Sequence, residues 1–397
     1  MKKLIQIVTP LICIISTYIY YSGLTEKLSR TETAEKRDSI TTISISFVGD
    51  LMCHSTQFNY AYVAADSFNF NGVFSEVKDY LSSSDFTIGN LETVLGGKDL
   101  GYSGYPFFNA PDDFLYAIKV AGFDFLVTSN NHALDQGEAG ARRTINKLSE
   151  LGINYTGTFL SQEDRDSLRI NTINGIEIAI LAYSYGTNDI PIPKGKEYLI
   201  NVIDTLLIKD DISIVKKYNP DIVLVYFHFG EEYDREPDTF QNEIVQKAIF
   251  YGADIIIGSH PHVIQPVKYF KTVNGNIDTG FVAYSLGNFI SNQKWRYTDA
   301  GVILTMDISK NIFTDSVYLN NVNCVPTWVY KGKIEKGNEF VILPASISSE
   351  DTILTYLTQE DKLIMRQAFT DTKQILSSYN STIPIVSMFS KEETYSR

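Results

Sequence analysis

Between residues 43 and 290 the chain alternates short apolar runs with segments of helical periodicity. The apolar runs are rich in β-branched and aromatic residues with few polar interruptions, which is typical of strands buried on both faces. They predict strands over 43–49, 86–90, 123–129, 176–184, 221–229, 254–259 and 280–287. The intervening segments predict helices over 73–82, 112–121, 138–151, 204–217 and 239–251. This alternation predicts an α/β domain.

The regions on either side of this block have a different character. Beyond residue 290, three more runs predict an antiparallel set of strands, and residues 350–379 predict a polar amphipathic helix. Residues 23–42 are polar and charged without apolar periodicity, as in a tether. We therefore expect four parts: an N-terminal segment 1–22, a tether 23–42, one domain 43–345 and a helical extension 346–397.

The N-terminal segment has the pattern of a membrane-targeting sequence. Lys2 and Lys3 precede an uncharged, mostly apolar stretch from Leu4 to Tyr21, whose length lies between that of a signal-peptide core and that of a spanning helix. The absence of a small-residue cleavage site favours an uncleaved signal anchor; a cleaved signal peptide or a soluble helix are the alternatives. With the lysines inside, the protein would cross the cell membrane once and expose its main domain on the extracytoplasmic side.

Charge excludes one class of partner. The formal net charge is −13, which argues against nucleic acid because a phosphate backbone requires a basic face.

The polar residues that could carry chemistry gather where the predicted strands end. All five histidines lie in short polar clusters that follow apolar runs. In open α/β sheets, ligands bind beyond the carboxyl ends of the strands. The clustered residues are Asp50 and His54, Asn90 and Glu92, Asn131, His132 and Asp135, His228 and Glu232, His260 and His262, and Asn288. Imidazole with carboxylate suits Mn, Zn or Fe, so this pattern predicts a site for one or two divalent metal ions.

Taken singly, several of these residues have an ordinary structural interpretation. His228 in an apolar strand could be a hydrogen-bonded core histidine, and Asp50 or Glu92 could cap a helix. The turn that holds His260 and His262 is harder to explain by packing. A His-x-His pair can present two nitrogens to one ion, or one to the metal and one to the substrate.

Six segments together carry a family resemblance: GDLMCH (49–54), GNLET (89–93), SNNHALDQG (129–137), HFGEEY (228–233), GADIIIGSHPHVIQPV (252–267) and YSLGNF (284–289). In order and spacing, over residues 44–290, they resemble the CapA family of capsule and poly-γ-glutamate biosynthesis, a branch of the calcineurin-like metallophosphoesterase superfamily. The resemblance implies a four-layer αββα sandwich of the metallo-dependent phosphatase type. Two central mixed sheets would hold the site at one end.

The resemblance also implies roles for the clustered residues. The implied metal ligands are Asp50, Glu92, Asn131, His228, His260 and His262. The implied catalytic residues are His132, as proton donor or transition-state stabiliser, and Asp135, which would orient it. The implied substrate-binding residues are Asn90, Glu232, Asn288 and His54.

This chain departs from the usual superfamily pattern at three places. The usual Asp-x-His is absent, because His54 comes two residues too late after Asp50. Asn90 and Glu92 stand where the superfamily places an Asp that bridges two metals, and Ser259 replaces the Gly before the first histidine of the closing motif. A Glu could bridge with a longer reach, so one ion and two ions both remain open.

The resemblance implies a membrane-anchored, CapA-like protein of capsule or poly-γ-glutamate biosynthesis or export with a metallophosphoesterase-type site. Its partners would be an anionic polymer such as poly-γ-glutamate or a phosphoester substrate, together with membrane ligase and transporter subunits. Two alternatives remain. One is a metal-dependent phosphoesterase or other hydrolase acting on an extracytoplasmic substrate, and the other is a non-catalytic, metal-stabilised scaffold in a membrane complex.

Overall fold

The computed structural model of the protein describes residues 18, 21–22, 40–335, 337–346, 354–379 and 383–386. Most of the predicted membrane anchor and most of the predicted tether therefore lie outside the described residues. Within the described ranges, no helix is both long and apolar enough to cross a membrane. The first strand starts at Ile40, slightly before the predicted start of the domain.

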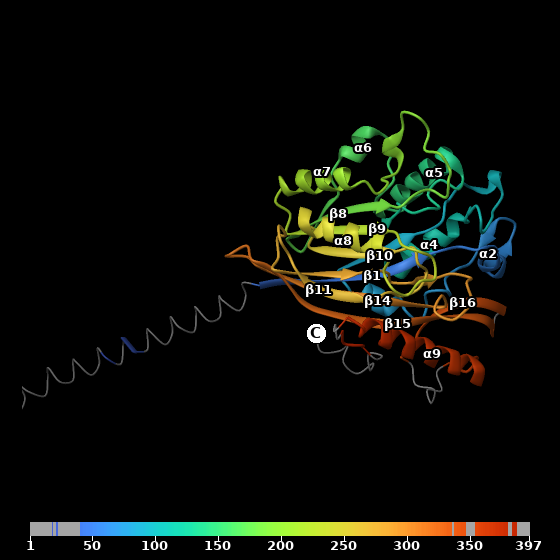
Figure 1. Ribbon diagram of the computed structural model, residues 1–397. Helices are drawn as coiled ribbons and strands as arrows, with labels where there is room; N and C mark the ends of the chain where they lie inside the picture. The colour runs from blue at the N-terminus through green and yellow to red at the C-terminus, as the bar shows by residue number, and fades with distance from the viewer. Residues whose placement is uncertain are drawn as a thin grey trace, which may run out of the picture.

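Two mixed sheets pack face to face in the centre of the molecule (Figure 1). The first has the order β16-β15-β14-β1-β4-β5-β6, with β13 beside the end of β1. Its parallel strands are β1 (Ile40–Leu51), β4 (Phe86–Leu91), β5 (Phe125–Val127), β6 (Asn154–Thr156) and β13 (Asn288–Ile290). Its antiparallel strands are β14 (Ala300–Asn311), β15 (Val317–Ile334) and β16 (Gly337–Pro344), as predicted for the region after residue 290.

The second sheet has the order β11-β12-β10-β9-β8-β7. Its inner strands are parallel: β8 (Ile176–Ser184), β9 (Ile222–His228), β10 (Ile255–Ser259) and β12 (Thr279–Ala283). The edge strands β7 (Ile170–Ile173) and β11 (Val267–Lys271) are antiparallel to their neighbours. A short hairpin, β2 (Tyr62–Ala64) and β3 (Ser67–Phe68), lies apart from both sheets.

Helices cover the outer face of each sheet, which gives the predicted four-layer α/β arrangement (Figure 1). The first sheet packs against α3 (Lys78–Ser82), α4 (Asp112–Ala121) and α5 (Gly137–Glu150). The second packs against α7 (Thr205–Lys216) and α8 (Thr239–Tyr251). The other α-helices of the described residues are α2 (Ser55–Ala61), α6 (Gln162–Asp166) and α9 (Gln359–Leu376). The last, α9, packs on β14 and β15 within the predicted C-terminal extension.

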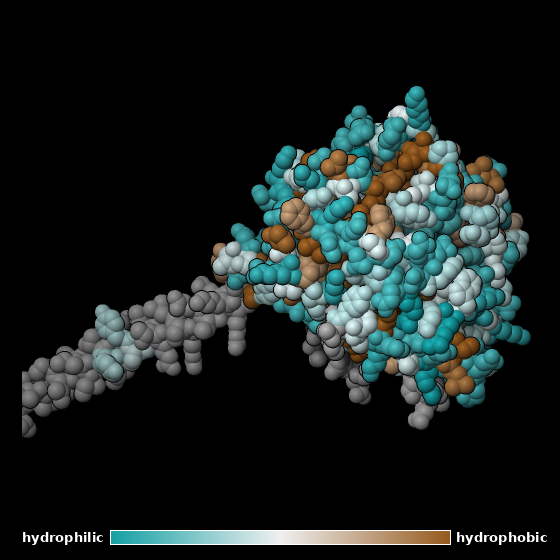
Figure 2. Space-filling view, in the orientation of Figure 1, coloured by the Kyte–Doolittle hydropathy of each residue, from teal (hydrophilic) through white to brown (hydrophobic). Residues whose placement is uncertain are grey.

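A continuous apolar core fills the space between the sheets. Phe47 and Ile88 of the first sheet belong to the same buried cluster as Leu224 of the second. Hydrogen bonds also join the layers; for example, the Tyr226 hydroxyl donates to the Val48 carbonyl over 3.0 Å. The outer surface, as far as Figure 2 shows it, is mostly hydrophilic with apolar residues in scattered groups.

The bounds of several predicted elements differ from those in the structure. The helix predicted from residue 73 begins only at Lys78, because residues 71–77 form turns. The strand predicted over 280–287 stops at Ala283, because the next residues turn towards β1. Helix α8 has its predicted bounds, and the side chain of its N-cap residue, Asp238, accepts from the Gln241 backbone.

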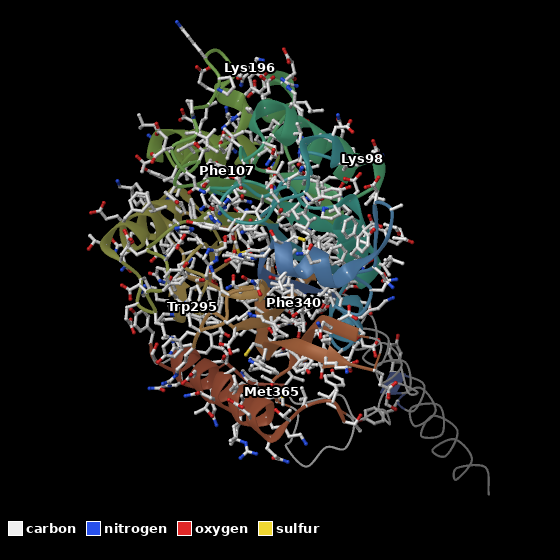
Figure 3. The ribbon with its side chains drawn as sticks, turned by 90° about the vertical axis from the view of Figure 1, so that its right-hand side faces the viewer. Lys98, Phe107, Lys196, Trp295, Phe340 and Met365 are labelled. Carbon is white, nitrogen blue, oxygen red and sulfur yellow. The ribbon has the colours of Figure 1, made fainter. Side chains whose placement is uncertain are left out.

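That turn towards β1 depends on a glycine. A Cβ at Gly49 would lie 1.8 Å from the Gly287 carbonyl oxygen, so only glycine permits the approach. The Asp50 backbone N–H then donates to that oxygen over 3.0 Å, and Asn288 pairs with Asp50 in register. Because the parallel strands end at one edge, the polar clusters that follow them converge there. Figure 3 views the molecule from this side.

Candidate metal centre

Asp50, at the end of β1, is fully buried and held from two sides. Asn90 at the end of β4 donates from Nδ2 to Asp50 Oδ1 over 2.8 Å. His262, in the loop after β10, places Nδ1 3.1 Å from Asp50 Oδ2. The contact with His262 joins the first sheet to the second.

Glu92 follows β4 directly and is the most unusual group of the site. Its side chain is completely buried, and neither carboxylate oxygen has a hydrogen-bond partner among the described residues. Oε1 lies 3.6 Å from His228 Nε2 and 3.7 Å from His262 Nε2. Burial, together with the nearby Asp50 charge, raises the pKa of Glu92 well above its usual range. Burying a carboxylate without hydrogen-bond partners is energetically unfavourable, and a bound cation would compensate its charge.

Three groups of side chains have ligand atoms within 4.8 Å of one another. They are Glu92 with His228 and His260, Asp50 with Glu92 and His262, and Glu232 with His260 and His262. Glu92 belongs to the first two groups, so its carboxylate lies where it could contact an ion in each. Nitrogen and oxygen donors at this spacing fit Zn, Mn or Fe.

The histidines of these groups have the protonation state that metal binding requires. Burial, and then the neighbouring imidazoles, lower the pKa of His228 and of His260 well below the usual value. Both rings are therefore neutral near pH 7, and His260 Nδ1 is buried without a hydrogen-bond partner among the described residues. Asn131 Oδ1 lies 2.8 Å from His228 Nε2, a separation that two ligands of one ion can have.

His132 and Asp135 form a separate pair beside the metal-ligand groups. His132 Nδ1 lies 2.7 Å from Asp135 Oδ2, which also accepts the Phe108 backbone N–H over 2.7 Å. The Phe108 ring packs edge-on against the His132 imidazole with centroids 4.7 Å apart. Burial raises the pKa of Asp135, with the His132 contact opposing the shift. The pair fixes the orientation of the imidazole.

The four predicted substrate-binding residues occupy different surroundings. Asn90 is buried against Asp50. Asn288 is buried too, with Nδ2 bonded to Gln293 and to the Thr298 carbonyl and with Oδ1 unpartnered among the described residues. Glu232 is exposed beside His260 and His262.

His54 lies in none of the three metal-ligand groups that the described residues form. It is the N-cap residue of α2, and its Nδ1 accepts from the Asn292 backbone over 3.3 Å. Its ring packs against Phe108 at 5.0 Å, and burial lowers its pKa to about 4. His54 therefore lies in the wall of the site.

Sequence reasoning missed two residues in the segment after β8. The Tyr185 ring lies 4.5 Å from that of His260, and the Asn188 side-chain carbonyl accepts from Asn131 over 3.1 Å. Asn188 has a left-handed backbone with φ of 49°. Their position directly after a predicted strand could have indicated that they belong to the site. The segment that contains Tyr185 and Asn188 has no histidine or glutamate, so it lacks the residue types by which the other clusters were found.

Fold and site together define an α/β protein with a candidate divalent-metal centre at the carboxyl edge of two facing sheets. The sequence model of the bacterial capsule synthesis protein family PGA_cap matches residues 44–293, and the chain belongs to this family. The predicted family resemblance is thereby confirmed.

Two curated relatives have related names. The capsule biosynthesis protein CapA of Bacillus anthracis is 29% identical over 322 residues, covering 78% of this chain and 73% of that protein. The PGA biosynthesis protein CapA of Bacillus subtilis (strain 168) is 28% identical over 272 residues, covering 68% of each.

Solved structures show only distant similarity. The NAD nucleotidase of Haemophilus influenzae has a TM-score of 0.43 and 14% identity, covering 89% of this chain and 58% of that one. The calcineurin-like phosphoesterase YfkN of Bacillus subtilis has a TM-score of 0.39 and 11% identity, covering 84% and 99%. At these scores neither similarity supports an inference about function.

Proposed function

We propose that this protein is a metal-dependent hydrolase that acts in the synthesis or export of a capsule polymer, most simply poly-γ-glutamate. The names of the two CapA relatives support the pathway. The N-terminal apolar segment supports a single-pass anchor that places the main domain outside the cell membrane, close to membrane ligase and transporter subunits.

The observation that carries the hydrolase part is the Glu92 carboxylate. It is buried and has no hydrogen-bond partner among the described residues. Its Oε1 lies 3.6 Å from Nε2 of His228, at the end of β9, and 3.7 Å from Nε2 of His262, in the loop after β10. If the Glu92 carboxylate had a purely structural role, neighbouring N–H or O–H groups would be expected to donate hydrogen bonds to it. We propose that the negative charge of Glu92 is compensated instead by one divalent cation, or by two cations that lie on either side of the carboxylate.

The protein groups around the centre suit cleavage of an ester or amide. A bound metal polarises the scissile oxygen and lowers the pKa of water. Asp135 accepts the hydrogen bond from His132 Nδ1, which leaves Nε2 as the atom that gives a proton to the leaving group or takes one from the nucleophile. Asn90 keeps Asp50 in place through a hydrogen bond.

The net charge of −13 bears on the substrate. An acidic body repels a polyanion at a distance, so a carboxylate or phosphoryl group would be drawn in by the metal centre itself. Metal removal should therefore abolish both binding and turnover of an anionic substrate.

The test compares the parent protein with a His260→Ala, His262→Ala double variant. We expect elemental analysis to find one or two Mn, Zn or Fe ions in the parent and fewer in the double variant. Phosphoesterase and γ-glutamyl hydrolase assays should show turnover only where the metal is retained. His54→Ala is the matched control, because that histidine lies outside the three metal-ligand groups, and it should keep its metal.

Two results would contradict the proposal. Unchanged metal content in the double variant would contradict the assignment of His260 and His262 as metal ligands. A parent that binds stoichiometric metal but turns over neither substrate class would support the alternative of a metal-stabilised scaffold in a membrane complex.

A further inference from the structure

Ser259 lies against one of the candidate metal ligands. It stands where the superfamily has a glycine, at the end of β10, and it is fully buried. It pairs in register with His228 at the end of β9, and its Oγ lies 2.9 Å from His228 Nδ1. A glycine has no side chain that could make this contact. The serine therefore adds a hydrogen-bonding group directly behind the His228 ring.

The side chain of Asn90 determines which hydrogen bonds His228 Nδ1 can make. Asn90 Nδ2 lies 3.2 Å from His228 Nδ1 and also donates to Asp50 Oδ1 over 2.8 Å. The amide is held in this orientation, because Asn90 Oδ1 accepts from Asn130 Nδ2 over 3.2 Å. An amide nitrogen only donates, so it can hydrogen-bond to Nδ1 only while Nδ1 carries no proton.

These contacts assign the proton of the neutral His228 ring to Nε2. Nε2 lies 2.8 Å from Asn131 Oδ1, which accepts a hydrogen bond from it. The same nitrogen faces the candidate metal centre, since it lies 3.6 Å from Glu92 Oε1. A metal ion binds the lone pair of an unprotonated imidazole nitrogen. Metal binding at Nε2 therefore requires that the ring carry its proton on Nδ1 instead.

The Ser259 hydroxyl can hydrogen-bond to Nδ1 in either state of the ring. A serine hydroxyl is both a donor and an acceptor, and it rotates to suit its partner. Of the two described side chains within hydrogen-bond distance of Nδ1, Asn90 only donates, so Ser259 is the one that can accept from an Nδ1–H. Histidines that bind metal almost always donate their second N–H to such an acceptor.

We propose that Ser259 is a positioning residue that allows His228 to change tautomer when metal binds. Its hydroxyl donates to Nδ1 in the metal-free protein and accepts from Nδ1–H in the metal-bound protein. The proton on Nε2 leaves to water and water supplies one to Nδ1, so the ring stays neutral and releases no net proton. The inference rests on the proposed function for the metal centre, but it concerns metal binding and not turnover.

Nitrogen-15 spectra of the full chain, labelled at histidine, test the tautomer change directly. Couplings between the ring nitrogens and the ring carbon-bound protons show which nitrogen carries the proton, and the chain has only five histidines. The His228 signals are identified by their loss in His228→Gln. We expect the Nε2–H tautomer in EDTA and the Nδ1–H tautomer with Zn²⁺. This test uses the parent protein, so it does not depend on the folding of a Ser259 variant.

Calorimetry of Zn²⁺ binding measures the contribution of the hydroxyl. Ser259→Ala should weaken binding about 10–100-fold, because Nδ1–H then loses its acceptor. Ser259→Thr keeps the hydroxyl on a β-branched side chain that suits a strand, so it should restore most of the affinity. Ser46→Ala is the matched control, because Ser46 is also fully buried in a strand, with its hydroxyl hydrogen-bonded to Thr305 over 2.9 Å. It should bind Zn²⁺ like the parent.

The outcomes separate this inference from the proposed function. Zn²⁺ binding with His228 still in the Nε2–H tautomer, an Nδ1–H tautomer already present in EDTA, or equal affinities of Ser259→Ala and Ser46→Ala would each overturn the inference and leave the proposed hydrolase standing. A tautomer change on Zn²⁺ binding, without turnover of either substrate class, would support the inference and contradict the hydrolase. A parent that binds no divalent metal would contradict both.

Discussion

Replacing Glu92 by glutamine should have opposite effects on the metal-free and metal-bound protein. The substitution keeps the shape of the side chain and removes its charge. In the metal-free protein, Glu92 is buried without partners beside Asp50, and its pKa is raised accordingly. Removing a buried, uncompensated acid should increase the free energy of unfolding by about 1–3 kcal/mol.

The same change should remove metal-dependent stabilisation. A metal present at about 100 times its dissociation constant adds about 2.7 kcal/mol to the parent. A glutamine offers one neutral oxygen in place of a carboxylate shared by two ligand groups, so affinity should fall sharply. We therefore expect Glu92→Gln to melt above the parent in EDTA and below it with saturating Mn or Zn.

Thermal unfolding with and without metal, followed by circular dichroism, measures both effects. Glu243→Gln is the matched control, because Glu243 is exposed on α8 and should behave like the parent in both conditions. A Glu92→Gln variant that is less stable than the parent in EDTA would contradict this prediction. Equal stabilisation of the variant and the parent by metal would also contradict it.

Three further predictions concern other groups. Asp135→Asn should lower the turnover of the proposed hydrolase on the order of 100-fold, because a neutral amide replaces the carboxylate that orients His132 and stabilises its protonated form, and leave elemental metal content unchanged; a drop in both would indicate a structural role. Burial lowers the pKa of Lys331 from 10.5 to about 8. The unfolded chain therefore holds this proton more tightly, and Lys331→Met should stabilise the protein by about 1–2 kcal/mol at pH 7. The gain should fade between about pH 8 and 10.5 in urea unfolding, and a pH-independent gain would contradict the assignment. Asp371→Asn removes the carboxylate that pairs with Arg296, the residue after Trp295. Trp295 should then become more accessible to acrylamide quenching, and unchanged quenching would show that this ion pair does not fix the position of Trp295.

Much of the fold could be predicted because helix ends and buried strands have clear local sequence patterns. Helices α4 and α8 have their predicted bounds, and α8 begins at a capping residue and ends at Gly252 in the left-handed region. Strand β8 also matches, because its continuous apolar run can be buried only within a sheet. The prediction failed where tertiary contacts decide, as in the residues after Ala283, which leave the strand to approach Gly49.

The site was predictable in part for a similar reason. Parallel strands share a carboxyl edge, so the clusters after them had to meet, and the structure brings Asp50, Glu92, His228, His260 and His262 together. Which side chains share an ion depends on angles and distances between loops far apart in sequence, and no local pattern encodes them.

The central claim is that the Glu92 carboxylate binds metal where the two ligand groups that share it meet. Anomalous diffraction from a crystal grown with Mn²⁺ tests it most directly. We predict a peak at about 2.0–2.3 Å from a Glu92 oxygen, with His228 or His262 nitrogen at a similar distance. A peak elsewhere, with both Glu92 oxygens free of metal, would contradict the account.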